Sequence, residues 1–332
     1  MSQQEQDNQA TAAAPKVFWE ERGPNTPRFF LTRAWIYSKE MFPVLVYLPY
    51  VIALYGCTNL IVQMLSGDEI VIDTMAIVGM ISAFFMMLLM RTFDDLKDFE
   101  IDKDLFPHRA TPKKLVLKAD ITAISLFSFL VLLNVNVFCG QSTMGVFAIM
   151  ISYCLLTYKW FFAEKYHRQH IFFTMLDHQP IPYVINFFLI HTALATGSHY
   201  EAFGFNHLIL WLIVSLPVTA WEVSRKVRSA DMETHYETFS MVIGLKLATI
   251  IPMIFMAVTG LMCAYIGNEL HFSMWFFVVD ALVIGAILFY YLRFLIYPTK
   301  ENNVLTNVAL FTTTGLFFNL MIHTIYSYVS HS

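Results

Sequence analysis

Residues 72–104 read IDTMAIVGMISAFFMMLLMRTFDDLKDFEIDKD, an apolar run that ends in a series of aspartates. The run is long enough for a helix that crosses a lipid bilayer. Asp94, Asp98 and Asp102 recur every fourth residue, so on a helix they share one face. Such carboxylates at a membrane helix end are costly unless something positive neutralises them. Because Mg²⁺ typically binds one or two carboxylates plus substrate phosphates, the stretch predicts a membrane enzyme that handles a diphosphate through Mg²⁺.

The composition places the whole chain in a membrane. Of its 332 residues, 57% are hydrophobic and 14% are charged, with a mean hydropathy of +0.56. These values exclude an ordinary soluble domain. Spans should be helical, since other backbone would leave polar groups unpaired in lipid. Stretches of roughly 18 or more mostly apolar residues predict nine transmembrane helices, at about 42–65, 72–93, 119–139, 143–162, 172–196, 205–222, 240–266, 273–298 and 304–329.

The distribution of Lys and Arg predicts the orientation of the chain. Four of the short connections contain neither residue, near 66–71, 140–142, 197–204 and 267–272. The basic residues cluster before the first span and in the alternate connections. By the positive-inside rule, we expect the N-terminus in the cytoplasm and the C-terminus on the opposite side of the membrane.

The first 41 residues differ from the rest. Residues 1–27 are polar and predict a disordered cytoplasmic tail without a cleaved signal peptide. Residues 28–41, RFFLTRAWIYSKEM, mix aromatic with basic residues and predict an amphipathic helix at the membrane interface. We therefore expect a membrane domain over residues 42–330.

Two long charged connections follow the second and sixth predicted helices. They read DDLKDFEIDKDLFPHRATPKK (94–114) and EVSRKVRSADMETHYETFS (222–240). Being four helices apart, both emerge on one membrane face, which suggests two four-helix halves with a ninth helix added. Their charges could form one site, or could simply be solvated and fix the topology.

The first charged connection resembles the aspartate-rich motif of the UbiA superfamily of intramembrane prenyltransferases. The family pattern is NDxxDxxxD, and here Asp95, Asp98 and Asp102 match it while Asp94 stands in place of Asn. Arg109 in HRATP resembles the Arg-Pro pair that follows, with alanine in place of proline. Residues 237–244, ETFSMVIG, resemble the family segment TLPxxxG.

The second charged connection departs from the family pattern, which there is DxxxD. Val227 takes the place of the first acid, and Asp231 keeps the second. The chain offers Glu222, followed by Arg225 and Lys226, in an ExxRK arrangement. The departure affects the acceptor and product that the resemblance implies more than it affects the expected binding of diphosphate.

The resemblance implies an all-α polytopic membrane protein with nine helices in a UbiA-like bundle around a central cavity, and Mg²⁺-dependent prenyl transfer. The expected Mg²⁺ ligands are Asp94, Asp98, Asp102 and Glu222, and Asp95 is a further candidate catalytic residue. Lys159 matches a lysine that family members carry after helix 4, and a membrane-anchoring role is the alternative for it. The candidate diphosphate ligands are Arg91, Arg109, Lys159, Arg225, Lys226 and Arg228.

The predicted fifth helix contains ionisable residues. Asp177 and His178 lie about six residues into it, in LDHQPIPY, where such groups usually face a cavity or a partner. Pro180 and Pro182 predict a break in this helix. Asp177 and His178 could hold an acceptor or remove its proton, whereas we expect His167 of the preceding loop at the interface.

The leading hypothesis is transfer of an isoprenoid chain from a prenyl diphosphate to a lipophilic acceptor, which we expect to be aromatic. The expected partners are these two substrates and the bilayer, without nucleic acid. A terpene cyclase that uses the diphosphate without an acceptor is the main alternative. A non-enzymatic transporter is a remote one, because the acids gather at one membrane face rather than at the midplane, where transporter sites usually lie.

Overall fold

The computed structural model describes residues 22–197, 202–233 and 238–331, and their regular structure is entirely helical. The predicted disordered tail, 1–27, lies mostly outside these residues. The chain divides into two compact units. The first contains Met1–Val44 and Leu88–Ser128, and the second contains Leu45–Met87 and Phe129–Ser332.

Most of the apolar runs form long helices. Eight helical segments in the described residues are long and apolar enough to cross a membrane, so the chain is an integral, multi-pass membrane protein. The fold class predicted from the sequence is thereby confirmed. The helices of these segments are α3 (Val44–Ser66), α4 (Thr74–Lys97), α6 (Lys118–Cys139), α7 (Met144–Tyr158, preceded by the 3₁₀ turn η1, Gln141–Thr143), α11 (Phe205–Ser224), α13 (Leu245–Glu269), α14 (Met274–Ile296) and α15 (Leu305–His331).

The predicted span 172–196 differs, because it consists of two shorter helices. These are α9 (Ile171–His178) and α10 (Ile181–Leu194), separated by Gln179 and Pro180. Proline lacks an N–H and its ring clashes with the preceding helical turn, so it ends a helix but is tolerated at the start of the next one. The break expected from the prolines is present. Eight described helical segments therefore reach spanning length where the sequence predicts nine.

The first unit surrounds the acidic connection with short helices. It contains α2 (Phe30–Met41), the end of α4, α5 (Phe99–Leu105) and the start of α6. A helix as short as α5 is unstable alone, so packing must hold it in place. Its Phe99 belongs to a small buried core with Tyr37, Ala110, Val116 and Ile121. The predicted helix at 28–41 is thus present, while its place at the membrane interface stays a prediction.

A buried ion pair joins α2 to α6. The Arg33 guanidinium donates through Nε and Nη2 to the two carboxylate oxygens of Asp120, both at 2.8 Å. Asp120 Oδ2 also accepts from the Leu117 backbone N–H at 2.9 Å. Because a buried charge without a partner is strongly destabilising, this pair fixes α2 against the start of α6.

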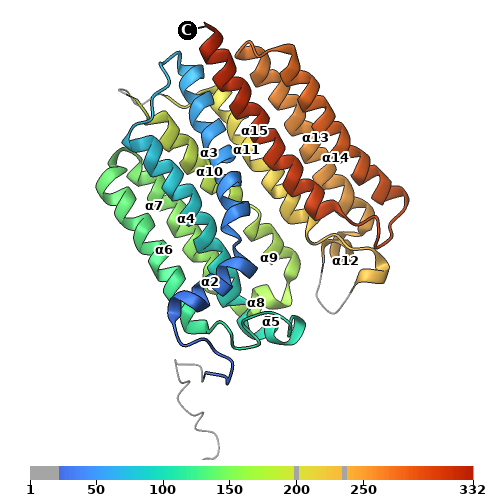
Figure 1. Cartoon of the computed structure of the whole chain (residues 1–332). Coiled ribbons are helices and arrows are strands. Elements are labelled where there is room, and N and C mark those ends of the chain that lie inside the picture. The colour runs from blue at the N-terminus through green and yellow to red at the C-terminus, as the bar shows by residue number, and fades with distance from the viewer. Residues whose placement is uncertain (1–21, 198–201, 234–237, 332) are drawn as a thin grey trace, which may run out of the picture. The chain divides into compact units, whose positions relative to one another are not determined.

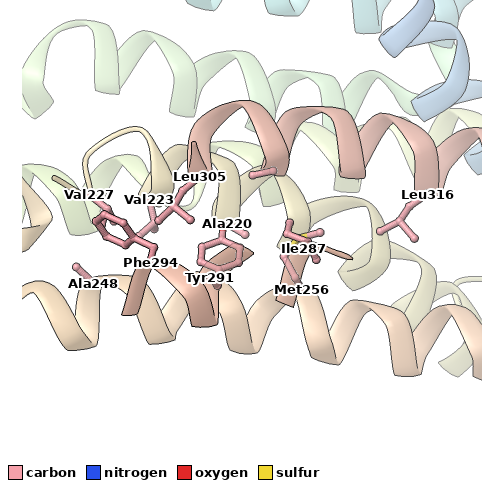
Figure 2. Packing of buried hydrophobic residues seen from close by; sticks show 11 residues of the cluster. Ala220, Val223, Val227, Ala248, Met256, Ile287, Tyr291, Phe294, Leu305 and Leu316 are labelled. Carbon is pink, nitrogen blue, oxygen red and sulfur yellow. The ribbon is translucent and has the colours of Figure 1, made fainter. Parts of the chain in front are cut away.

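In the second unit, α11, α13, α14 and α15 pack side by side (Figure 1). Helix α10 packs against α11 and against α7. Lipid offers helices no hydrophobic driving force for association, so close packing must hold them together. Figure 2 shows the buried cluster between these helices, formed by Ala220, Val223, Val227, Ala248, Met256, Ile287, Tyr291, Phe294, Leu305, Ala309 and Leu316.

A tyrosine ring of α3 packs against a glycine of α4. A Cβ atom built on Gly79 of α4 would lie 2.0 Å from the ring of Tyr55 on α3. Tyr55 is fully buried, and its hydroxyl accepts a hydrogen bond from Thr192 Oγ1 at 3.2 Å. The absence of a side chain at Gly79 therefore makes room for the tyrosine ring.

We expect Gly79→Ala to destabilise the protein, because the ring of Tyr55 has to shift within a packed environment. Overpacking of this kind costs about 1–3 kcal/mol, measurable as a lower midpoint in thermal unfolding in detergent. Gly285→Ala in α14 is the control, since a Cβ there has nothing within 4 Å. Equal midpoints for the two variants would contradict this account of Gly79.

Candidate functional site

The aspartate series spans the junction of α4 and α5. Asp98 interrupts the helix, with φ −95° and ψ 7°. Backbone bonds of helical spacing nevertheless cross the junction, from Asp98 N–H to the Asp94 carbonyl at 2.9 Å and from Asp102 N–H to the Asp98 carbonyl at 2.8 Å. The backbone arrangement implied by the i, i+4 spacing is therefore present, and the role of these residues as metal ligands stays a prediction.

The four aspartates of residues 94–102 differ in exposure. Asp94 is exposed, and Asp98 and Asp102 are partly buried. Asp95 is only 6% exposed, and both of its carboxylate oxygens accept hydrogen bonds. Its Oδ2 accepts from the Tyr37 hydroxyl at 2.6 Å, and its Oδ1 from Arg91 Nη2 at 2.5 Å. Asp95 thus has a different environment from the other three.

Tyr37 is a site residue that the sequence analysis missed. It lies on α2, 58 residues before Asp95. Burial, followed by the charge of Asp95, raises the pKa of Tyr37 well above its usual range. The phenol therefore stays protonated and donates to the carboxylate. Nothing in the local pattern of residues 28–41 separates this tyrosine from an ordinary interfacial one.

Arg109 lies beside the aspartate series. Its Nη1 is 2.8 Å from Asp102 Oδ2, and its guanidinium lies 3.8 Å from the centroid of the Phe106 ring. A cavity of about 10 Å³ is lined by Asp95, Asp102 and Arg109 together with Met41, Phe99, Thr111, Pro112 and Ile121. This volume is close to the minimum for one water molecule, so ion pairing and packing largely close this side of the series.

The second charged connection begins at the end of α11. Arg225 Nη1 is 2.8 Å from Glu222 Oε1, and its guanidinium lies 4.9 Å from the Trp221 ring centroid. About a third of both charged side chains is exposed, 36% for Arg225 and 33% for Glu222. Lys226 Nζ lies 5.9 Å from the centroid of the Phe239 ring. Acid and bases are thus mixed at this helix end.

Hydrogen bonds close this connection on itself. Phe239 N–H donates to the Lys226 carbonyl at 2.9 Å, and Arg228 N–H to Ser240 Oγ at 2.7 Å. Asn303 Nδ2, from the connection between α14 and α15, donates to the Val227 carbonyl at 2.9 Å. These hydrogen bonds fix the backbone that carries the basic residues Arg225, Lys226 and Arg228.

Val227 explains the departure from the acidic pattern. Its side chain is 2% exposed and belongs to the buried cluster of Figure 2. A carboxylate would be costly to bury at such an apolar position. Asp231, in the 3₁₀ turn η3 (Ala230–Met232), is exposed. The place of the first acid has thus become a packing position.

The segment that resembles TLPxxxG surrounds the short helix α12 (Phe239–Ile243), and its first residue lies outside the described ones. The Thr238 hydroxyl caps the helix by accepting from the Met241 N–H at 3.3 Å. Gly244, with φ +82°, turns the chain into α13 in a conformation that favours glycine.

Lys159 ends α7. Its backbone N–H closes the last turn, its side chain is exposed, and Nζ lies 5.0 Å from the Tyr158 ring centroid. The next three residues, the 3₁₀ turn η2 (Trp160–Phe162), all have positive φ, at 52°, 49° and 60°. Such values are uncommon for bulky residues, so the chain turns sharply after Lys159.

Asp177 of α9 contacts a histidine of α8 (Glu164–Gln169). The side chain of His167 is buried, and its Nε2 lies 2.9 Å from Asp177 Oδ2. The other ring nitrogen lies 2.9 Å from the Ala163 carbonyl oxygen. The expected place of His167 at the membrane interface stays a prediction. His178 contacts the Thr174 carbonyl oxygen through Nδ1 at 2.7 Å. The centroid of the Trp160 ring lies 6.1 Å from that of His167 and 5.8 Å from that of His178.

The described residues contain no group of three or more His, Cys, Asp and Glu side chains arranged to hold a metal ion. Mg²⁺ at a diphosphate site needs less, because it retains waters and is bound by one or two carboxylates plus phosphate oxygens. Carboxylates such as exposed Asp94 and partly buried Asp98 fit that requirement in their donor chemistry. The assignment of Asp94, Asp98, Asp102 and Glu222 as ligands stays a prediction.

Comparison with known proteins identifies the fold. No family model matches the chain, and no curated protein sequence matches it. A solved structure described as digeranylgeranylglyceryl phosphate synthase in membranes is similar, with a TM-score of 0.60 and 15% identity. The match covers 89% of this chain and 99% of that one. This chain and that synthase share one fold.

The bond from Asn303 generates a prediction for the second charged connection. A hydrogen bond of this kind contributes about 1 kcal/mol, so Asn303→Ala should speed amide hydrogen exchange in residues 225–232 by roughly fivefold. Asn302→Ala is the matched control, since that side chain donates to the Tyr297 carbonyl, five residues before it, and not to Val227. Unchanged exchange in Asn303→Ala would show that this contact does not hold the connection.

Proposed function

We propose that this chain transfers an isoprenoid chain from a prenyl diphosphate to a lipophilic acceptor, which we expect to be aromatic. The chain has the fold of the UbiA-type membrane prenyltransferases. The observation that carries the proposal is the aspartate series of Asp94, Asp98 and Asp102. It lies at the end of a helix of spanning length, is joined by helical backbone bonds, and has Arg109 beside it. This arrangement suits a diphosphate at a membrane surface.

The charged residues would bind the leaving group. When bound by Asp94, Asp98, Asp102 and Glu222, Mg²⁺ would neutralise the charge that develops on the diphosphate. Arginine adds bidentate, charge-assisted hydrogen bonds to phosphate oxygens. The side chains proposed for this role are Arg91, Arg109, Lys159, Arg225, Lys226 and Arg228.

The remaining steps concern the hydrocarbon. Cleavage of the carbon–oxygen bond leaves the diphosphate with the electron pair and an allylic cation on the isoprenoid. The acceptor attacks the cation and then loses one proton. Asp177, whose side chain is 40% exposed and oriented by His167, is the residue proposed to hold the acceptor or take that proton.

Terpene cyclisation is the second candidate. The buried Val227 in place of an acid favours it, since the second connection then differs most where the family pattern is acidic. In this reaction the same cation is attacked by a double bond of its own chain. Only the partner of the cation distinguishes the two functions.

We expect Asp98→Ala to lower the rate of pyrophosphate release from a prenyl diphosphate by roughly 100-fold or more, because a ligand oxygen is lost. Purified protein in detergent with excess Mg²⁺ allows the measurement. Asp104→Ala is the control, because Asp104 is exposed and lies outside the i, i+4 series. Release at the wild-type rate from Asp98→Ala would refute the proposed role of the series.

Incubation with Mg²⁺ and prenyl diphosphates in the absence of any acceptor separates the two candidate functions. The transferase should release little product, whereas adding lipophilic aromatic acceptors should yield a prenylated compound. Mass spectrometry of the extracted lipids identifies the products. A cyclic hydrocarbon or terpene alcohol without acceptor would instead establish the cyclase.

A further inference from the structure

We propose that Asp95 is a positioning residue and not a metal ligand. The Tyr37 hydroxyl holds its carboxylate, and the carboxylate in turn holds Arg91 for the diphosphate. This inference rests on the proposed function, and it concerns a residue that matches the acidic motif of the family. The environment of Asp95 in this chain gives that aspartate another task.

The direction of the side chain is the first reason. Successive helical residues are about 100° apart, so Asp95 projects away from the face shared by Asp94 and Asp98. Exposure agrees, because Asp94 is exposed while Asp95 is 6% exposed. Asp94, which takes the place of the family Asn, therefore faces outward. Asp95, which matches the first Asp of the family pattern, faces into the protein.

The partners of Asp95 are the second reason. A carboxylate that binds Mg²⁺ must present an oxygen to the ion. Here Oδ2 accepts from the Tyr37 hydroxyl at 2.6 Å and Oδ1 from Arg91 at 2.5 Å. Hydrogen bonds that involve a buried charged group are among the stronger ones in proteins. With both oxygens bonded and only 6% of Asp95 exposed, the carboxylate presents little free surface to an ion.

This arrangement orients the side chain of Arg91. Arg91 lies one helical turn before Asp95, and 22% of its side chain is exposed. Its Nη2 also contacts Met41 Sδ at 3.8 Å, so the guanidinium is held from two sides. An arginine that is already oriented loses less conformational freedom on binding an anion, which increases affinity.

Helix α2 connects this arrangement to the surface of the protein. Tyr37 is 1% exposed, whereas Leu31 and Trp35 of the same helix are 78% and 59% exposed. The buried face of α2 thus reaches Asp95, and its opposite face presents large apolar side chains. The position of α2 consequently affects the orientation of Arg91.

Tyr37→Phe tests the inference, because it removes only the hydroxyl. We expect the KM for prenyl diphosphate to rise roughly tenfold, with kcat changed less than about twofold and the half-saturating Mg²⁺ concentration unchanged. The binding of a non-reactive prenyl thiodiphosphate, measured by thermal shift, should weaken by the same factor. Tyr55→Phe is the matched control, since it removes another buried hydroxyl, which belongs to the second unit and bonds to Thr192. Arg91→Lys should weaken thiodiphosphate binding as Tyr37→Phe does.

Two results would overturn the inference. A lower half-saturating Mg²⁺ concentration in Tyr37→Phe would mean that release from the tyrosine lets Asp95 bind metal. Unchanged KM and thiodiphosphate binding would mean that Tyr37 does not position Arg91. If the wild-type protein itself fails to bind the thiodiphosphate, the proposed function fails, an outcome distinct from a variant that binds as the wild type does.

Discussion

The charge of the carboxylates at the end of α4 is the constraint on which the acidic region depends. Carboxylates next to an apolar span are costly unless donors and cations surround them. The first unit supplies these through Tyr37, Arg91 and Arg109, each from a different segment of the chain. Tyr37, which donates to Asp95, also belongs to the small core around Phe99 of α5. Charge compensation and packing therefore meet at this residue.

The second charged connection solves a related problem differently. Its first acid, Glu222, has a basic partner one turn away in Arg225, whose guanidinium lies over the Trp221 ring. The buried side chain of Val227 anchors the backbone. Asn303, in the connection between α14 and α15, donates a hydrogen bond to the same residue. Apolar packing thus replaces a carboxylate at position 227, and the neighbouring basic side chains extend from a fixed backbone. A site with fewer acids and more fixed cations would rely more on direct contacts with an anion.

The sequence predicted what depends on local composition and spacing. Long apolar runs, the helix at 28–41, the break near Pro180 and the continuity of the aspartate series all follow from rules that act within a few turns. Pairings across the chain could not be predicted this way. The contact of Tyr37 with Asp95 and that of His167 with Asp177 depend on how helices pack, and no periodicity encodes them. The count of spanning helices differed for a simple reason: hydropathy does not register a two-residue interruption.

The ion pair between Arg33 and Asp120 also bears on how the protein is made. The two residues are 87 positions apart, so at roughly 5–20 residues per second a ribosome adds the aspartate roughly 4–17 s after the arginine. During that interval α3 and α4 are synthesised while α2 lacks its partner. The acidic unit can therefore close only late, after the helices that follow α2 have been made. Its assembly therefore requires segments that are synthesised well after the N-terminal helix α2.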